Sequence, residues 1–230
     1  MERWWMPLPE DVSTFGPRID SLFFVILWIT GIVFILVEVL LVYYLVKYRA
    51  REGRRAIFSH GNKRLEIIWT TATFAIVFFL GLASRPLWSD VKEPSRFPRS
   101  GLALNVTAKQ FEWHVTYPGP DGRLGTADDF EKRNELDIPM GVPIHVTLRA
   151  EDVIHSFFLP QFRLKQDAVP GMEIPAWFQA TKTGEYVLGC AELCGLGHYR
   201  MRGRVIVRSP EDFQQWLQQQ TQVRTANATP

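Results

Sequence analysis

Four residues near the C-terminal end have the side chains and the spacing of a metal-binding loop. The segment CAELCGLGHYRM, residues 190–201, contains Cys190, Cys194, His198 and Met201, and its two cysteines are the only ones in the 230 residues. Thiolate, imidazole and thioether ligands together favour copper over hard cations. A mononuclear blue-copper site uses one cysteine, whereas two thiolates can bridge two copper ions. The loop therefore predicts a copper site, and the second cysteine favours a binuclear one.

A second imidazole must come from elsewhere, because each of two bridged copper ions needs one. Among the other histidines, His60 lies in a basic loop, and His114 and His145 fall within expected strands. His155, in DVIHSFFLP, stands at the end of an expected strand, 35 positions before Cys190. It is the best candidate, although without the cysteine loop a lone histidine would be read as an ordinary surface or core residue.

The composition limits the classes of protein. Hydrophobic residues make up 47% of the chain, and the formal net charge is +2 without a basic block of the kind that binds nucleic acid. Two cysteines cannot form a multi-disulfide framework, although they can form one disulfide. The N-terminal residues do not predict a cleavable signal peptide.

Two long apolar runs predict membrane-spanning helices. Residues 22–46 are 25 residues with a single charge, Glu38, and residues 67–84 carry none. About 20 apolar residues cross the hydrocarbon core of a bilayer as a helix. Two buried helices of a soluble protein are the alternative, which the length and the near absence of charge disfavour. For Glu38 we favour a neutral carboxyl bonded to a neighbouring helix over a proton or partner contact.

The loop between these runs predicts the orientation in the membrane. Only Arg3 and Arg18 are basic before the first run, whereas the loop has seven basic residues: Lys47, Arg49, Arg51, Arg54, Arg55, Lys63 and Arg64. By the positive-inside rule the loop is cytoplasmic, so both termini lie on the outer side.

After the second run the pattern changes to short strands separated by turns. Strands are expected in residues 102–117, 143–150, 184–190 and 203–209, with a Gly-, Pro- and Asp-rich loop at 117–129. Such spacing is typical of a β-sandwich or barrel. The expected organisation is an outer-side segment at 1–21, spans at 22–46 and 67–88, a cytoplasmic loop at 47–66, a linker at 89–101, a β domain at 102–210, and a short helix at 211–220 followed by a loose tail to 230.

The metal-binding loop resembles the binuclear copper (CuA) loop of cytochrome c oxidase subunit II, C-x-E-x-C-x-x-x-H-x-x-M. HSFFLP, KQDAVPG and LEIIWT, beginning at His155, Lys165 and Leu65, resemble that family's H-S-F-x-x-P, K-x-D-x-x-P-G and V-E-T-I-W-T motifs. The likeness extends over nearly the whole chain. It implies a two-helix transmembrane hairpin followed by an all-β, cupredoxin-like Greek-key domain.

The resemblance also implies roles for individual residues. Cys190 and Cys194 would bridge two copper ions, and His155 and His198 would each bind one. The remaining implied roles are a weak copper ligand for Met201, a backbone carbonyl ligand for Glu192, a magnesium ligand at the interface with subunit I for the Glu192 side chain, and the mouth of a proton pathway for Glu66. An acid that merely begins a helix at the interface is the alternative for Glu66.

One segment departs from the family pattern. The family commonly has Q-W-Y-W, whose first tryptophan receives electrons from cytochrome c, whereas this chain has Gln110, Phe111, Glu112 and Trp113. Phe111 therefore occupies the first tryptophan position, and either Phe111 or Trp113 is expected to contact the donor at the surface. Packing in the sandwich core is an equally good interpretation of Trp113.

The implied function is an electron relay in a respiratory complex. Electrons would pass from cytochrome c, or a similar small donor, to haem in subunit I, which would reduce oxygen to water and translocate protons. The implied partners are subunit I, subunit III and membrane lipid, in a bacterial inner membrane. The chain would thus act in an enzyme without holding the oxygen-reducing site.

Four other interpretations compete with this function. A quinol oxidase subunit II lacks the copper ligands, and nitrous oxide reductase is soluble and carries a large propeller domain, so both fit poorly. A membrane-anchored copper carrier, or a plain Cys190–Cys194 disulfide in an oxidising compartment, stays open from the residues alone.

Overall fold

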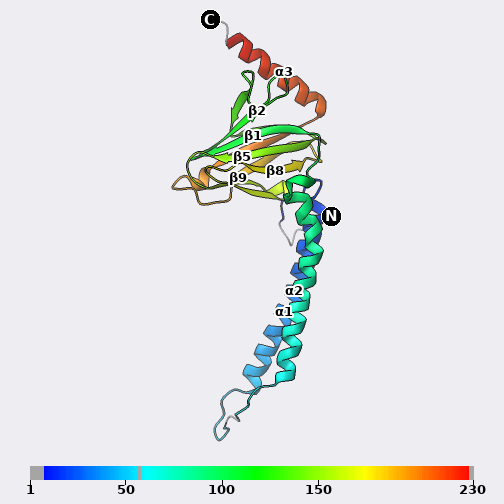
Figure 1. Cartoon of the computed structure of the whole chain (residues 1–230). Coiled ribbons are helices and arrows are strands. Elements are labelled where there is room, and N and C mark those ends of the chain that lie inside the picture. The colour runs from blue at the N-terminus through cyan, green and yellow to red at the C-terminus, as the bar shows by residue number, and fades with distance from the viewer. Residues whose placement is uncertain (1–7, 56–57, 228–230) are drawn as a thin grey trace. The chain divides into compact units, whose positions relative to one another are not determined.

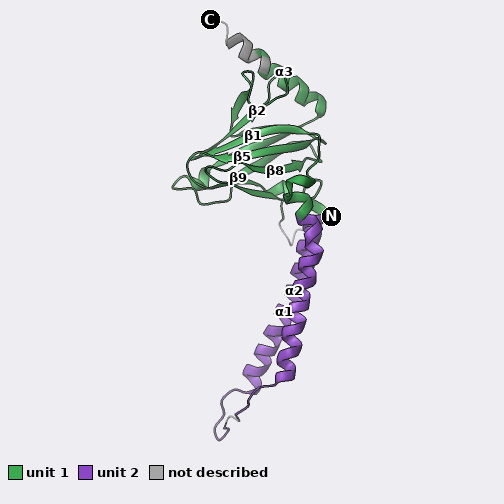
Figure 2. Cartoon of the chain, viewed as in Figure 1, with its two compact units in different colours: residues 1–17, 89–230 green, residues 18–88 purple. Residues whose placement is uncertain are grey.

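The structure, a computed structural model, describes residues 8–55 and 58–227 and divides the chain into two compact units (Figures 1 and 2). One unit comprises residues 18–88 and contains most of two long helices. The other combines residues 1–17 with residues 89–230 and contains the β domain. The outer unit, as we call this second one, is therefore built from two separate pieces of the chain.

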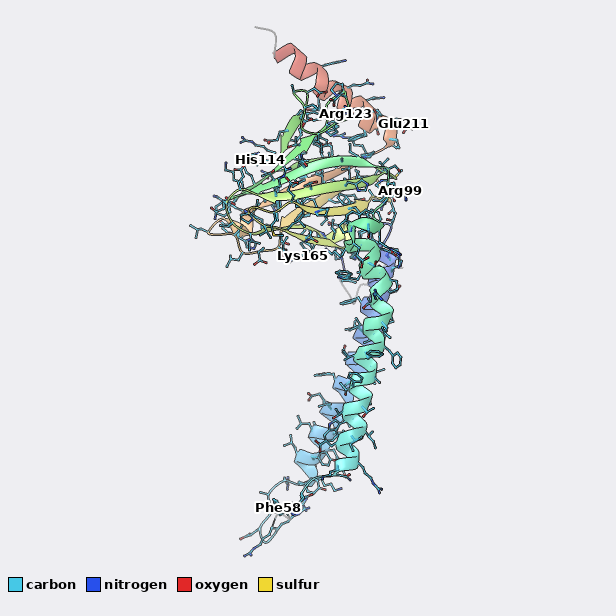
Figure 3. All side chains as sticks on the ribbon, in the orientation of Figure 1. Phe58, Arg99, His114, Arg123, Lys165 and Glu211 are labelled. Carbon is cyan, nitrogen blue, oxygen red and sulfur yellow. The ribbon has the colours of Figure 1, made fainter. Side chains whose placement is uncertain are left out.

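The two long helices are α1, Gly16–Lys47, and α2, Lys63–Lys92. At 1.5 Å per residue, helices of 32 and 30 residues are longer than the hydrocarbon core of a bilayer is thick. Their apolar stretches are not buried within the chain, unlike the core helices of a soluble protein. Figure 3 shows Phe58, which is 82% exposed, on the loop that connects them. Both helices are therefore long and apolar enough to cross a membrane, as the sequence predicts.

Helix α2 contains Pro86 and continues beyond the expected end of the second span, residue 88, as far as Lys92. Contacts within the outer unit explain the added length. The Asp90 carbonyl accepts a hydrogen bond from Trp177 Nε1 at 3.0 Å, and Lys92 Nζ donates to the carbonyl of Lys165 at 2.7 Å. The first part of the expected linker is therefore helical, because tertiary contacts stabilise this last turn despite the proline.

In the described part of the outer unit, ten strands form two five-stranded sheets. The first sheet has the order β3-β2-β1-β5-β8, and the second has the order β4-β10-β9-β6-β7. The pairs β1–β5 and β4–β10 are parallel, and the other neighbours are antiparallel. The strands are β1 Leu102–Lys109, β2 Glu112–Tyr117, β3 Phe130–Arg133, β4 Glu135–Pro139, β5 Pro143–Ala150, β6 His155–Leu159, β7 Leu164–Ala168, β8 Ile174–Gln179, β9 Gly184–Cys190 and β10 Arg202–Arg208.

Alternating side chains build the core between the sheets. On β5, Ile144, Val146 and Leu148 are buried while their neighbours face outward, as the period of two in a strand requires. Strand β1 repeats the pattern with Leu104, Val106 and Ala108. The expected strands are confirmed, and the region 102–117 forms two of them, joined at Gln110 and Phe111 by a cis peptide bond.

The N-terminal segment packs into the β domain, although it was expected only as an outer-side segment. Val12 is fully buried; its N–H donates to the carbonyl of Gln161 at 2.9 Å, and its carbonyl accepts from the N–H of Thr181 at 2.8 Å. Phe15 is buried against the edge of Trp177. This segment adds a short bridge beside the end of β8 and completes the core there.

The C-terminal helix α3, Pro210–Asn227, is longer than the predicted helix at 211–220. Trp216 packs against Tyr117 and Phe130, with ring centroids 5.2 and 5.9 Å apart. The expected loose tail is therefore helical as far as Asn227, and its last three residues lie outside the described residues.

Candidate metal centre

The predicted ligands come from two neighbouring strands of the second sheet and the loop between β9 and β10. Strand β6 begins with His155 and β9 ends with Cys190. Phe157 pairs with Cys190 in register, which brings His155 to the same end of the sheet as the cysteine loop. Sheet pairing thus closes the 35-residue gap in the sequence.

Backbone hydrogen bonds close the base of the ligand loop, residues 191–201. The N–H of Cys190 donates to the carbonyl of Met201 at 3.2 Å, and the N–H of Ala191 donates to the carbonyl of Ser156 at 3.1 Å. A short 3₁₀ helix, His198–Arg200, then orients His198 at the far side of the loop. The loop therefore leaves and re-enters the second sheet at the same place and keeps its ligand residues close together.

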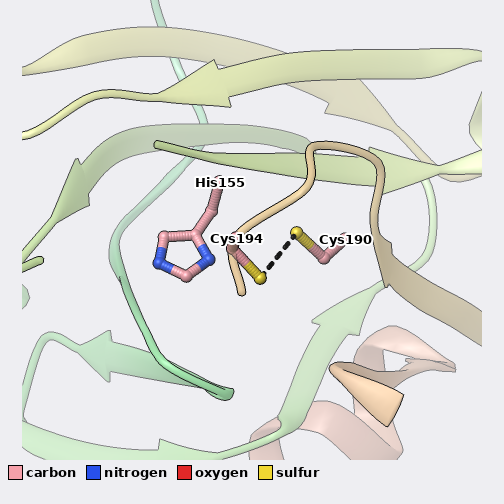
Figure 4. A group of neighbouring side chains, drawn as sticks. All are labelled: His155, Cys190 and Cys194. Carbon is pink, nitrogen blue, oxygen red and sulfur yellow. Dashed lines mark hydrogen bonds between the residues drawn. The ribbon is translucent and has the colours of Figure 1, made fainter. Parts of the chain in front are cut away.

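Three ligand atoms gather at one point, as Figure 4 shows for His155, Cys190 and Cys194. A ring nitrogen of His155 and the two sulfur atoms all lie within 4.8 Å of one another. The sulfur atoms are 3.9 Å apart and both cysteines are free thiols. A disulfide would need about 2.05 Å, so the disulfide interpretation does not describe this structure.

The other three predicted copper ligands lie beside this group. Cys194 Sγ is 3.6 Å from His198 Nδ1 and 3.7 Å from the Met201 sulfur. The carbonyl oxygen of Glu192 accepts a hydrogen bond from Cys190 Sγ at 3.2 Å, while the Glu192 side chain is exposed. The structure brings all six residues together, with the carbonyl rather than the carboxylate of Glu192 facing the sulfur atoms.

His155 has the orientation of a metal ligand whose second nitrogen is held in place. Its ring is fully buried, and Nε2 lies 2.8 Å from Asp152 Oδ1. Its Nδ1 is buried and has no hydrogen-bond partner among the described residues. A buried polar atom without a partner costs free energy. A metal ion bound to Nδ1 would remove that cost, and a carboxylate on the other nitrogen is the usual outer partner of a metal-bound histidine.

The burial of Cys194 and its proximity to Cys190 favour the protonated form of the Cys194 thiol. Burial, followed by the neighbouring Cys190 thiol, raises the pKa of Cys194 to about 11. Burial also acts on Asp152, yet hydrogen bonds from His155 and from the backbone N–H groups of Gln110 and Val153 lower the pKa of its carboxyl. A cation would be needed to hold the Cys194 sulfur as a thiolate at neutral pH.

The two aromatic residues predicted to receive electrons lie in different environments. Phe111 is half-buried in the turn between β1 and β2, next to the ligand loop. Trp113 is fully buried and packs edge-on against His155 and Phe157, with centroids 6.3 and 5.7 Å apart. Its environment corresponds to core packing, because a fully buried ring makes no surface contact.

The two predicted acids of the long helices lie outside this centre. Glu66 is exposed in the first turn of α2, which Asn62 caps by accepting hydrogen bonds from the N–H groups of Arg64 and Leu65. This placement is the one expected for an acid that begins a helix. Glu38 lies exposed within α1.

Sequence reasoning missed two residues that support the ligands, Gln110 and Asp152. Gln110 donates a side-chain hydrogen bond to the carbonyl of Cys194, and Asp152 accepts one from the Gln110 backbone at 2.7 Å. Asp152 lies three positions before His155, and a carboxylate so close to a candidate ligand could have been predicted to bond its imidazole. Gln110 matches the first position of the Q-W-Y-W motif, but that match does not show its contact with the ligand loop, which spans 84 positions of the chain.

Comparison with known families covers both units of the chain. A family model described as the periplasmic domain of cytochrome c oxidase subunit II matches residues 106–209, and a model of the transmembrane domain of that subunit matches residues 2–87. An "alternative cytochrome c oxidase subunit 2" from Bradyrhizobium diazoefficiens is 34% identical over 94% of this chain and 84% of the relative. The chain belongs to the cytochrome c oxidase subunit II family.

Other relatives agree with this membership. Cytochrome c oxidase subunit 2 of Thermostichus vulcanus is 32% identical over 97% of this chain and 81% of its own length. Among solved structures, the chain is also similar to the periplasmic domain of a Bradyrhizobium japonicum oxidase subunit II, with 33% identity over 53% of this chain and 94% of that domain and a TM-score of 0.48; the membership rests on the full-length relatives instead.

Membership settles several expectations. This subunit II is a membrane protein with two spans and a periplasmic β-sandwich domain. Its family belongs to haem-copper oxidases, respiratory oxidoreductases whose catalytic site lies on another subunit. The family implies copper, and the group of His155, Cys190 and Cys194 is the place in the described structure that suits it.

Proposed function

We propose that this subunit carries a binuclear CuA centre that relays electrons from cytochrome c, or a similar small donor, to haem in subunit I. Subunit I would reduce oxygen to water and translocate protons. The observation that carries the proposal is the buried, unpartnered Nδ1 of His155 beside two free thiols. The two copper ions, when bound, would supply a one-electron relay. They would share the change in charge that occurs when an electron arrives or leaves.

The chain's own residues would hold this group. Cys190 and Cys194, as thiolates, and the imidazoles of His155 and His198 would hold the two copper ions. The sulfur of Met201 and the carbonyl of Glu192 would be weak ligands. Asp152 would keep its hydrogen bond to His155 Nε2, so the ring could not turn when the oxidation state changes.

Rigid ligands suit electron transfer because the site rearranges little between its two states. Cys194 and Met201 are buried, with 3% and 2% of their surface exposed, and Trp113 packs beside His155. These side chains would exclude water from one side of the centre. Phe111, half-buried and next to the ligand loop, would be the contact at which electrons arrive, with Trp113 supporting the ligand from the core.

Other assignments belong to the same proposal. The exposed Glu192 carboxylate would help to hold magnesium at the interface with subunit I, and Glu66 would stand near the mouth of a proton pathway. The basic loop would face the cytoplasm of a bacterium, with the chain in its inner membrane beside subunit I, subunit III and lipid.

An electron paramagnetic resonance spectrum of the full chain, purified in detergent and loaded with copper, tests the proposal. We expect hyperfine structure from one electron shared by two copper nuclei, and loss of that pattern in Cys194→Ser. Met172→Leu, a substitution at an exposed methionine outside the site, is the matched control and should leave the spectrum unchanged. A spectrum of a single localised copper in the wild type, or an unchanged spectrum in Cys194→Ser, would refute the ligand assignment and favour a copper carrier.

A further inference from the structure

The turn between β1 and β2 contacts both halves of the candidate ligand set. The backbone N–H of Gln110 donates to Asp152 Oδ2 at 2.7 Å, and the other oxygen of that carboxylate holds His155 Nε2 at 2.8 Å. The side-chain amide of the same Gln110 donates to the backbone carbonyl of Cys194. One residue is thus linked to the ligand from β6 through its backbone and to the ligand loop through its side chain.

The next residue, Phe111, packs directly on the backbone of the ligand loop. A Cβ atom added at Gly197 would lie 2.5 Å from the Phe111 ring. At Gly195, where φ is +129°, an added Cβ would lie 2.7 Å from Gln110 Nε2 and 3.3 Å from the same ring. Both glycines therefore permit a close approach that any other residue would obstruct. The turn and the loop fit together without an intervening side chain.

The middle of the ligand loop has few large side chains packed against the sandwich, so the contacts from Gln110 and Phe111 are important for its position. Leu193, Leu196 and Tyr199 are 78%, 96% and 85% exposed, so these large side chains give the loop little anchorage in the sandwich. The base of the loop is fixed by the backbone bonds of Cys190 and Ala191. Between these points, Gln110 and Phe111 supply contacts from the opposite sheet, since β1 and β2 belong to the first sheet and β6 and β9 to the second.

We propose that Gln110 is a positioning residue that fixes Cys194 relative to His155 before metal binds. This inference rests on the proposed function, because the two residues matter as partners only if they share a metal centre. The amide suits the task, since its N–H group reaches a carbonyl of the loop while its own backbone N–H engages Asp152. Loss of the side chain would leave the Asp152 link intact and release the loop alone.

The experiment compares Gln110→Ala and Gln110→Glu with the wild type, as full chains in detergent. Glutamate keeps the size of the side chain but places oxygen where the N–H donor was, so it should behave like alanine. Gln179→Ala is the matched control, because Gln179 Nε2 also donates to a backbone carbonyl, that of Gly141, at 2.7 Å. Gln110→Asn, which retains an amide but is too short to reach, provides a second test should either variant fold poorly.

The first readout is hydrogen exchange of residues 190–201 in the metal-free chain. We expect exchange roughly tenfold faster in Gln110→Ala, Gln110→Glu and Gln110→Asn than in the wild type or the control. Exchange at the wild-type rate in these variants would overturn the proposal. This readout needs no copper, so it tests the positioning role even if the proposed function fails.

The second readout is the copper-loaded chain. We expect an altered hyperfine splitting and a shifted reduction potential in the Gln110 variants, with both unchanged in Gln179→Ala. A role in donor binding alone would instead raise the KM for a small redox donor and leave loop exchange, splitting and potential at wild-type values, and that outcome would also overturn the proposal. A wild-type spectrum without a shared electron would refute the binuclear relay separately.

Discussion

At the scale of single residues, the two nitrogens of His155 have separate tasks. Nε2 is committed to Asp152, so Nδ1 is left to face the two thiols. The carboxylate selects which nitrogen carries the proton and prevents the ring from turning. A histidine without this partner would lose orientation before it lost its position in the sheet.

Replacement of Asp152 should therefore weaken copper binding more than folding. We expect Asp152→Ala to lower copper affinity by about 10- to 100-fold, the range typical of lost outer partners of metal ligands. Competition with a chelator of known affinity measures this. Glu151→Gln removes the neighbouring carboxylate, which pairs with Lys109 on the surface, and should bind copper like the wild type. Equal affinities for the two variants would contradict the role of Asp152.

Trp113 makes its contribution through packing. The fully buried ring contacts His155 and Phe157, so Trp113→Ala should destabilise the outer unit by about 3–5 kcal/mol. Trp113→Phe should cost less, because an aromatic ring still fills most of the space. Thermal unfolding followed by the circular dichroism of the β domain gives both values. A cost near zero for alanine would show that the ring is not part of the core.

At the scale of elements, alternating patterns predicted some strands and not others. Strand β5 was predicted with its observed bounds because one of its faces is buried and the other is not. Strands β4 and β6, ELDIP and HSFFL, are buried on nearly every side chain, so they show no alternation to read. The ligand motif marked His155 as a candidate, but only the pairing of β6 with β9 shows how it meets Cys190.

A histidine on β2, His114, lies between a carboxylate on β3 and a carboxylate on β2. This arrangement predicts that the stability of the fold depends on pH. His114, labelled in Figure 3, lies 2.7 Å from Glu131 on β3 and 2.9 Å from Glu112 on its own strand. Partial burial opposes the charged imidazole, yet these two hydrogen bonds raise the pKa of His114 above its ordinary value.

Because the pKa of His114 is raised in the folded state, its stabilisation is complete below the unfolded pKa, about 6.5, and disappears as the pH rises through the folded value. We expect a loss of about 1 kcal/mol or less as the pH rises from 6 to 8, since the pair is partly exposed. Thermal midpoints measured across this interval should fall in the wild type and vary less in His114→Gln. Parallel curves for the two proteins would argue against this link.

At the scale of the whole molecule, the membrane topology could be predicted from the sequence because it depends on long segments of uniform composition. Two apolar runs and a basic loop predicted the membrane spans without any knowledge of contacts. The N-terminal segment was not readable, because Val12 pairs with Gln161 and Thr181, about 150 or more positions away. Its polar sequence, PEDVSTF, shows neither alternation nor helical periodicity.

That segment should contribute measurably to the stability of the outer unit. Val12→Asp would place a charge without a partner in a fully buried position, and we expect it to cost several kcal/mol. Glu10→Gln, which removes one partner of an exposed ion pair with Lys182, should cost between 0 and about 1 kcal/mol. Thermal unfolding of the β domain in the full chain compares the two. Similar midpoints would mean that the segment is not part of the core.

The origin of the outer unit in two pieces of the chain has a consequence for biosynthesis. The ribosome makes the residues around Val12 before either span, and Gln161 and Thr181 emerge only after both spans have been synthesised. The N-terminal residues must therefore cross the membrane early. They can pair with Gln161 and Thr181 only after most of the β domain has reached the same side. A chain whose residues around Val12 stayed on the cytoplasmic side would leave the edge beside β8 without its bridge and the core without the Val12 side chain. Completion of the fold thus reports that both ends of the chain have reached the same side of the membrane.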